Sequence, residues 1–279
     1  MGNMYLYTFE AFTVVCELHL EAPTQSVAND MTQMVITYAK ELEYRYSFFQ
    51  KTSEIYALNH RSSYTHIISD ELSGLLQMAL FYTDITHGAF DIALSGTLKA
   101  ASKAPTLVEY KRLKEELLPF ASSSHFTLEG NCLTFSNTIT KIDLGGLVKE
   151  YAVDQVSFQL QSRGILSALI NFGGDIAAYG TYHDTPWKIG IQNPDSLDSN
   201  LLEIELNSAS VCTSGHSKRF TTIEKENITH IIGSSSRDQN YNQVSVIAPT
   251  TVDAGVWSTA LLVNPNLIIP SHIQVLHTI

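Results

Sequence analysis

Residues 141–156 read KIDLGGLVKEYAVDQV and bring an acid, a glycine pair and a cation into one short segment. We expect Asp143 to end a strand, and the glycine pair Gly145 and Gly146 lets the backbone approach a ligand closely. The helix predicted next would direct its first N–H groups toward that gap, which favours an anion. Lys149 lies in the first turn, where a cation opposes the helix dipole, so a bound phosphate would explain it. A tight strand-to-helix turn with a solvated lysine is the alternative.

Three further segments combine glycine or hydroxyl side chains with ionisable residues. NFGGDIAAYG repeats the pattern of strand, glycine pair and acid, with Asp175 either in a site or capping a bulge or hairpin turn. TSGHSKRF places Thr213, Ser214 and Gly215 at a strand end before three basic side chains. It is either an anion site or a polar loop. His230 lies in a predicted strand and is either structural or a general base.

Helices and strands must position these residues. Helical spacing predicts helices over residues 24–46, from Ser69 to about Gly88, over 147–163 and over 252–262. Thr24 and Ser69 are suitable N-caps, and Gly88 is suited to end the second helix. Alternation predicts one strand over residues 5–20 and further strands at 166–174, 177–182, 187–192, 201–206, 209–215 and 243–249.

Two hairpins are also predicted. The first spans residues 125–136 with its turn at Glu129–Asn131, and the second spans 218–232 with its turn at Glu226–Asn227. Helices first and strands later indicate an α+β fold, with helices packed on a mostly antiparallel or mixed sheet. The length suffices for one large domain or two fused lobes. We expect a single domain over residues 1–279, helix-rich in 1–120 and strand-rich in 121–279.

Composition excludes several classes of protein. With 44% hydrophobic and 16% charged residues, the chain is globular and not disordered. A net charge of -11 argues against a nucleic-acid-binding surface, which needs clustered Lys and Arg. Three widely spaced cysteines predict neither a disulfide framework nor a zinc site.

No window of 18 consecutive apolar residues is found, so no membrane span is expected. The first Lys or Arg is Lys40, so residues 1–22 lack the basic region of a secretory signal. We therefore expect a cytoplasmic protein, or a periplasmic one if a signal has been removed.

Seven blocks of the chain, taken in order, resemble the ApbE family of flavin transferases (FAD:protein FMN transferases). The central block, Asp143–Asp154, resembles the family run DLGG-hydrophobic-x-K-x-Y-A-x-D. The other six are YSFFQKTSEIYALN (46–59), HGAFDIAL (87–94), Leu169–Asp175, Thr213–Gly215, His230–Ile231 and STALLV (258–263). The resemblance implies the ApbE architecture, similar to the T-fold.

The resemblance also implies a reaction. Such proteins bind FAD and, with Mg²⁺, transfer its FMN half to a Thr or Ser hydroxyl of an acceptor protein, releasing AMP. His230 is implied as the base and Lys149 as a catalytic residue at the phosphates. The FAD-lining positions implied are Phe12, Phe49, Ala89, Phe90, Asp91, Asp143, Lys149, Thr213, Ser214, Gly215 and Ile232. Phe12 and Phe49 stand where the family usually has Met and Tyr. The metal would be held by the Gly146 carbonyl and by Thr259 and Ser258.

Three departures from the family pattern bear on the metal and the base. Gly255 stands where the family usually has the Asp ligand of Mg²⁺, four residues before Thr259. Asp253 would point about 200° away on a helix, so Ser258, Asp175 and Glu150 are the other candidates to replace that ligand. Gly233 replaces the acid after the strand histidine, and His216 replaces the acid after TSG. The alternative function is therefore an FAD-binding protein without transferase activity.

Overall fold

The computed structural model describes residues 2–215, 220–224, 226–229 and 242–278. Its centre is a seven-stranded sheet in which every strand pairing is antiparallel. In spatial order the strands are β1 (Asn3–Ala11), β2 (Val14–Ala22), β6 (Ala168–Phe172), β7 (Asp175–Tyr179), β10 (Ala209–Gly215), β13 (Gln243–Ala248) and β14 (Gln274–Thr278). Helices pack on this sheet, which confirms the predicted α+β class.

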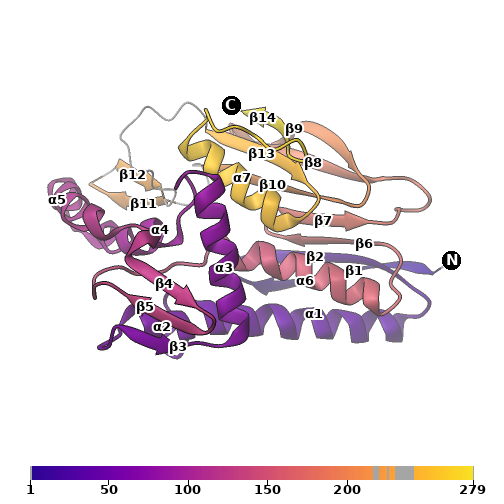
Figure 1. Cartoon of the computed structure of the whole chain (residues 1–279). Coiled ribbons are helices and arrows are strands. Elements are labelled where there is room, and N and C mark those ends of the chain that lie inside the picture. Colours follow the sequence, from indigo (N-terminus) through magenta and orange to yellow (C-terminus); the bar gives the residue numbers. More distant parts are fainter. Residues whose placement is uncertain (1, 216–219, 225, 230–241, 279) are drawn as a thin grey trace.

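The two faces of the sheet carry different layers because side chains alternate along each strand. On β7, Ala177 and Tyr179 join the main core under the helices, whereas Ile176 and Ala178 join a second apolar cluster. That second cluster packs under the hairpin of β8 (Trp187–Asn193) and β9 (Ser196–Leu206). The helices of the first face are α1 (Gln25–Tyr46), α6 (Val148–Ser162) and α7 (Thr251–Val263) (Figure 1).

The remaining elements lie beside this layered part (Figure 1). The helices are α2 (Glu54–Asn59), α3 (Asp70–Ile85), α4 (Ile92–Leu98) and α5 (Leu107–Leu117), with 3₁₀ turns at Ala101–Lys103, Leu118–Phe120 and Ser123–His125. The strands are β3 (Thr65–Ile67), β4 (Phe126–Glu129), β5 (Cys132–Phe135), β11 (Phe220–Ile223) and β12 (Glu226–Thr229). No helix in the described part of the chain is both long and apolar enough to cross a membrane.

Local signals placed the four predicted helices correctly, whereas α2 and α4 were not predicted. The Thr24 hydroxyl accepts a hydrogen bond from Val27 N at 3.3 Å and opens α1, as predicted. Ser69 caps α3 in the same way. Gly88, with φ of 77°, donates from its N–H to the Thr83 carbonyl at 2.8 Å and closes the end of α3. The predicted hairpin turn between β4 and β5 is confirmed as well.

Two strand predictions were wrong. Residues 5–20 form not one strand but the β1–β2 hairpin, because Phe12 and Thr13 adopt φ of 53° and 61° and turn the chain. Neither residue is a usual turn former, so the sequence does not show the break. The β11–β12 turn lies between Ile223 and Glu226, which pair with each other, and not at Glu226–Asn227.

Antiparallel order brings several chain reversals to one end of the sheet. The β1–β2 turn, the β6–β7 turn and the junction of β10 with β13 all lie there, since Cys16 pairs with Phe172 and Gly215 with Gln243. Helix α6 runs antiparallel to β6 and therefore begins at this same end (Figure 1). Described residues of three of these blocks, at the glycine pair of 143–154, at 169–175 and at 213–215, are thus gathered at one end of the sheet.

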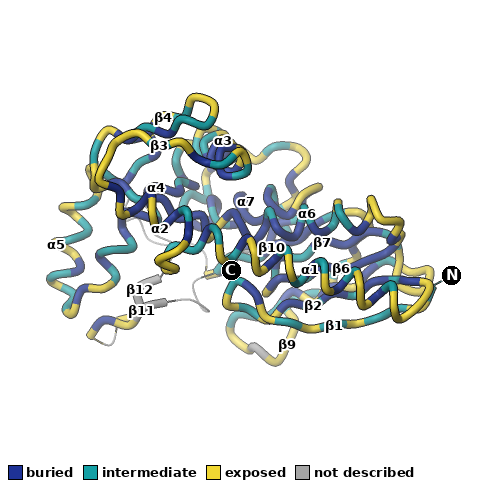
Figure 2. The backbone as a smooth tube through the Cα atoms, turned by 90° about the horizontal axis from the view of Figure 1, so that it is seen from below, coloured by how far each residue is buried: buried dark blue, intermediate teal, exposed yellow. Residues whose placement is uncertain are grey.

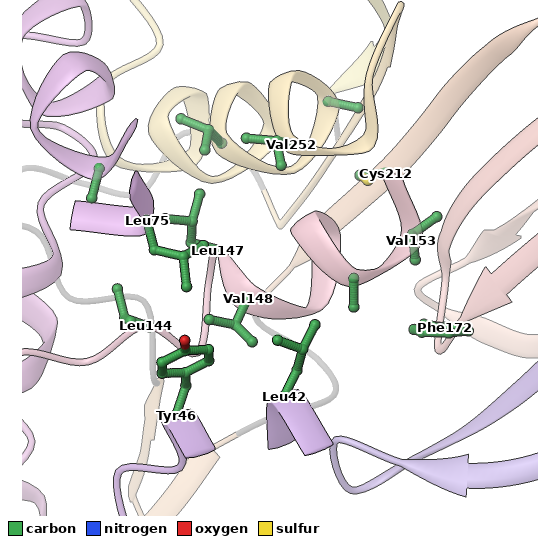
Figure 3. Packing of buried hydrophobic residues seen from close by; sticks show 14 of the residues in the cluster. Leu42, Tyr46, Leu75, Leu144, Leu147, Val148, Val153, Phe172, Cys212 and Val252 are labelled. Carbon is green, nitrogen blue, oxygen red and sulfur yellow. The ribbon is translucent and has the colours of Figure 1, made fainter. Parts of the chain in front are cut away.

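The first turn of α6 is anchored in the core. Figure 3 shows Leu147 and Val148 lying between Leu75 of α3 and the side chains of Leu42 and Tyr46 on α1. Burial continues along α6 and α7, and ten of the 13 residues of α7 are buried, whereas in α5 Tyr110 alone is buried (Figure 2). Apolar burial of this extent fixes the orientation of α6 relative to α7.

Candidate functional site

The segment before α6 is held by side chains and not by a strand ladder. Asn59 Nδ2 donates to the Ile142 carbonyl at 2.7 Å, and Asn59 Oδ1 accepts from Ile142 N at 2.7 Å. The Asp143 N–H donates to the Ile92 carbonyl at 3.0 Å. Asp143 therefore lies in an extended loop, and the prediction that it ends a strand was wrong. The matched Asn of the 46–59 block positions this loop, a role that its sequence context alone does not show.

Asp143 is buried and makes an ion pair with Lys99, a residue that the sequence analysis missed. Asp143 Oδ1 also accepts from Gly145 N at 3.0 Å, which shapes the turn into the glycine pair. The Lys99 ammonium lies 4.8 Å from the ring centroid of Phe48 and 4.9 Å from that of Phe49. No motif surrounds Lys99 in the sequence, so only the fold reveals this group.

Phe49, a predicted FAD-lining residue, is 65% exposed, so its ring is accessible beside the Lys99 cation. Phe12 lies in the β1–β2 turn with its ring centroid 6.2 Å from that of Phe172. Both rings are at the surface or partly buried.

Residues 89–91 come together beside the glycine pair. Ala89 and Phe90 are buried, and a Cβ on Gly146 would lie 3.7 Å from the Phe90 ring. Asp91 caps α4, accepting from Ala93 N at 2.8 Å, and also accepts from Ser123 N at 2.9 Å. The Asp91 carboxylate is therefore already used in joining α4 to the 3₁₀ turn Ser123–His125.

Lys149 points into the protein and not toward solvent. Its side chain is only 10% exposed, and its ammonium makes an ion pair with Asp175 of β7 and lies 3.5 Å from Glu150 Oε1. Asp175 faces α6 because it shares the helix-side face of β7 with Ala177. Two carboxylates against one ammonium leave one negative charge in excess in this cluster.

On α7, the residue that lies against the cluster of Lys149, Glu150 and Asp175 is Gly255. A Cβ on Gly255 would lie 2.5 Å from Glu150 Cγ, so the Glu150 side chain fills the space next to this position. Among the described residues, no hydrogen-bond partner is found for the buried Glu150 Oε2. Asp253 is directed elsewhere, since the Tyr82 hydroxyl donates to Asp253 Oδ1 at 2.7 Å. This is the orientation expected from helical spacing.

Three hydroxyl groups meet between β10 and α7. Ser214 Oγ lies 2.8 Å from Ser258 Oγ and 3.0 Å from Thr259 Oγ1. Ser258 also donates to the Gly255 carbonyl at 3.0 Å. Thr213, by contrast, points to the opposite face of the sheet, where its hydroxyl lies 2.8 Å from Ser245 Oγ. The structure thus joins Ser214 to the predicted metal residues and separates the Thr213 side chain from them.

Asp154, the last residue of the central block, connects α6 to α7. Its two carboxylate oxygens accept from Thr251 N at 2.7 Å and Val252 N at 3.0 Å at the start of α7. Burial raises the pKa of this carboxyl, while the hydrogen bonds from α7 act in the opposite direction. Asp154 therefore fixes the register between Glu150 on α6 and Gly255 on α7.

Two cysteines border this region. Burial raises the pKa of Cys212 well above its ordinary value and raises that of Cys16 to about 11. Both thiols are therefore protonated near neutral pH, which makes them poor nucleophiles.

The comparisons with known proteins agree with these blocks. The family model described as "ApbE family" matches residues 5–274. The chain belongs to the ApbE family. The FAD:protein FMN transferase of Vibrio cholerae is 26% identical over 235 residues, covering 80% of this chain and 70% of that protein. That of Treponema pallidum is 27% identical over 252 residues, covering 82% and 70%.

Solved ApbE structures share the fold. The ApbE protein of Thermotoga maritima superposes with a TM-score of 0.84 at 22% identity, covering 94% of this chain and 87% of that chain. The flavin transferase ApbE of Vibrio cholerae has a TM-score of 0.79 at 22% identity, with the same coverage. The predicted ApbE architecture is thereby confirmed.

Two predicted site residues lie in segments that the structure does not describe. His230 and Ile232, the predicted base and one predicted FAD-lining residue, lie outside the described residues, as do His216 and Gly233. Gly215 ends β10 immediately before one of these gaps.

The side chains of this ApbE site fit a hard cation in part. No group of three or more His, Cys, Asp or Glu residues in the described ranges could hold a metal. Mg²⁺, however, commonly takes one or two carboxylates and completes its six oxygens with water and phosphate. Buried carboxylates on α6 and β7, hydroxyls on α7 and β10, and the exposed backbone of Gly146 supply such oxygens.

Proposed function

We propose that this protein transfers the FMN half of FAD to a Thr or Ser hydroxyl of an acceptor protein, in a Mg²⁺-dependent reaction that releases AMP. The observation that carries the proposal is the ApbE family match over residues 5–274, together with relatives named FAD:protein FMN transferase. The meeting of described residues from the blocks 143–154, 169–175 and 213–215 at one end of the sheet supports it.

The chemistry is a phosphoryl-type displacement. The acceptor oxygen bonds to the phosphorus that stays with FMN, and the bond from this phosphorus to the bridging oxygen breaks. AMP leaves with that oxygen, and the hydroxyl proton is taken by a base, for which His230 is the candidate from the sequence. Bound Mg²⁺ would neutralise the phosphate oxygens as charge moves to the leaving group.

Several described residues have properties that suit FAD binding. The exposed ring of Phe49 beside Lys99 offers an aromatic face and a cation, and Phe90 borders the glycine pair. We propose that the start of α6 receives the phosphates, since its N–H groups and dipole favour anions. Lys149 would contribute through its positive charge from within the cluster formed with Asp175.

An FAD-binding protein without transferase activity is the second candidate. It is favoured by Gly255, because α7 lacks the acidic side chain that the family resemblance predicts as a Mg²⁺ ligand. A flavin pocket could persist where the metal site is lost. That an acceptor protein carries the Thr or Ser target, and that this protein is cytoplasmic, are both still predictions.

One incubation separates the two candidates. The full chain is mixed with FAD, Mg²⁺ and a Thr-containing acceptor protein from a flavinylated enzyme, with a Thr→Ala acceptor as control. AMP measured by chromatography and a fluorescent flavin adduct on the intact acceptor would support transfer. Bound FAD without AMP or adduct would support the second candidate, and absence of FAD binding would contradict both.

A further inference from the structure

The Glu150 side chain occupies a position that is unusual for an acid. It lies on α6 with 9% of its side chain exposed, and its Cγ is 2.5 Å from where a Cβ of Gly255 would stand. Burying a carboxylate without hydrogen-bond or ion-pair partners costs several kcal/mol of folding free energy, because the charge loses its hydration. Yet Oε2 has no hydrogen-bond partner among the described residues, and Oε1 has only the Lys149 ammonium at 3.5 Å.

Lys149 does not fully satisfy this acid. Its ammonium is shared with Asp175, so the cluster retains an excess negative charge. A second cation would balance that charge and supply a partner for Oε2. A hard divalent ion such as Mg²⁺ binds carboxylate oxygens.

Helix geometry places the remaining oxygens on the same side. Ser258 and Thr259 follow Gly255 by three and four residues, so they lie on the face of α7 that Gly255 presents. Ser258 donates to the Gly255 carbonyl, which shows that these groups are neighbours. Gly146 lies in the turn two residues before α6 begins, close in the chain to Glu150.

We infer that Glu150 on α6 supplies the carboxylate ligand of Mg²⁺ that the ApbE resemblance predicts at position 255 on α7. Across this contact α6 contributes the carboxylate, and Gly255 on α7 leaves room for it. The inference rests on the proposed Mg²⁺-dependent function, but it concerns binding of the ion and not the transfer step.

The test measures ion binding directly. Mn²⁺ is titrated into the full chain with and without FAD, and free Mn²⁺ is followed by electron paramagnetic resonance. Glu150→Gln keeps the shape and removes the charge. The matched control is Glu203→Gln, an exposed acid on β9 beside Lys188. Melting temperature and FAD fluorescence report folding and flavin binding separately.

We expect Glu150→Gln to weaken Mn²⁺ binding by at least about tenfold, since loss of even an outer partner of a metal commonly has that effect. Glu203→Gln should bind Mn²⁺ like the unaltered chain. The exchange variant Glu150→Gly with Gly255→Asp should restore binding, because it returns the carboxylate to α7. Gly255→Asp alone should lower the melting temperature, because its Cβ would meet Glu150.

Unchanged Mn²⁺ affinity in Glu150→Gln would overturn the inference and leave Glu150 as a structural partner of Lys149. A folded exchange variant that fails to regain binding would also overturn it, because positions 150 and 255 would then not be equivalent. If the unaltered chain binds Mn²⁺ through Glu150 but transfers no FMN, the inference stands and the proposed function fails. If FMN is transferred and Glu150→Gln retains its metal affinity, the reverse holds.

Discussion

Replacing Gly255 with alanine should have opposite effects on stability in two backgrounds. In a helix interior, Gly→Ala ordinarily raises the free energy of unfolding by about 1 kcal/mol. Here the added Cβ would stand 2.5 Å from Glu150 Cγ, a distance that real Cβ contacts do not show. Because that atom is held between α6 and α7, the contact cannot be relieved by moving only the end of a flexible side chain.

The magnitude follows from the two opposing effects. Overpacking of a buried contact costs about 1–3 kcal/mol. Set against the propensity gain of about 1 kcal/mol, Gly255→Ala should lower the free energy of unfolding by about 0–2 kcal/mol. In a Glu150→Ala background the obstruction is gone, and the same change should raise it by about 1 kcal/mol. The two backgrounds should thus differ by about 1–3 kcal/mol.

The assay is urea denaturation of the four proteins of this double-mutant cycle, followed by far-UV circular dichroism. Comparison within each background removes the separate effect of losing the Glu150 carboxylate. A gain in stability from Gly255→Ala of the same size in both backgrounds would refute the packing of Glu150 against Gly255, on which the assignment of Glu150 as a metal ligand also rests.

Two further predictions test the framework of the site, and a third concerns His19, which lies beside Trp187 on the other face of the sheet. Asn59→Ala should lower the free energy of unfolding by about 2–3 kcal/mol in urea denaturation, because it leaves the buried N–H and C=O of Ile142 unpaired; Asn59→Asp should restore only the bond from the Ile142 N–H. Asp154→Ala should lower it by about 2–4 kcal/mol by uncapping α7, and a loss below about 0.5 kcal/mol would contradict that role. Burial lowers the pKa of His19 in the folded protein, and the charge of Glu17 opposes this shift. The contribution of His19 to stability is therefore fully present above about pH 6.5, its ordinary pKa. That contribution is lost as the pH falls toward the lowered pKa of the folded state, because the unfolded chain then binds the proton more readily. Between pH 7.5 and pH 5, the melting temperature of the His19→Phe variant should therefore fall less than that of the unaltered chain. An equal fall in both proteins would contradict this prediction.

Much of the fold could be predicted from the sequence because its signals are local. Thr24 and Ser69 cap their helices through bonds to N–H groups three residues away, so the chain near each cap contains the whole signal. The ordered ApbE-like blocks identified the family, since their spacing needs no knowledge of contacts. Where a turn lacked its usual residues, as at Phe12 and Thr13, the local signal was missing and the hairpin was not predicted.

The relations within the site were decided only by tertiary structure. Lys149 is paired with Asp175, a residue far along the chain that strand alternation turns toward α6. Lys99 reaches Asp143, and Glu150 fills the space beside Gly255, through helix packing that no spacing in the sequence encodes. Sequence determines which groups are available and which local elements form. Which carboxylate faces which glycine depends on how buried apolar surfaces fix the helices against the sheet, because that packing sets distances between residues remote in the chain.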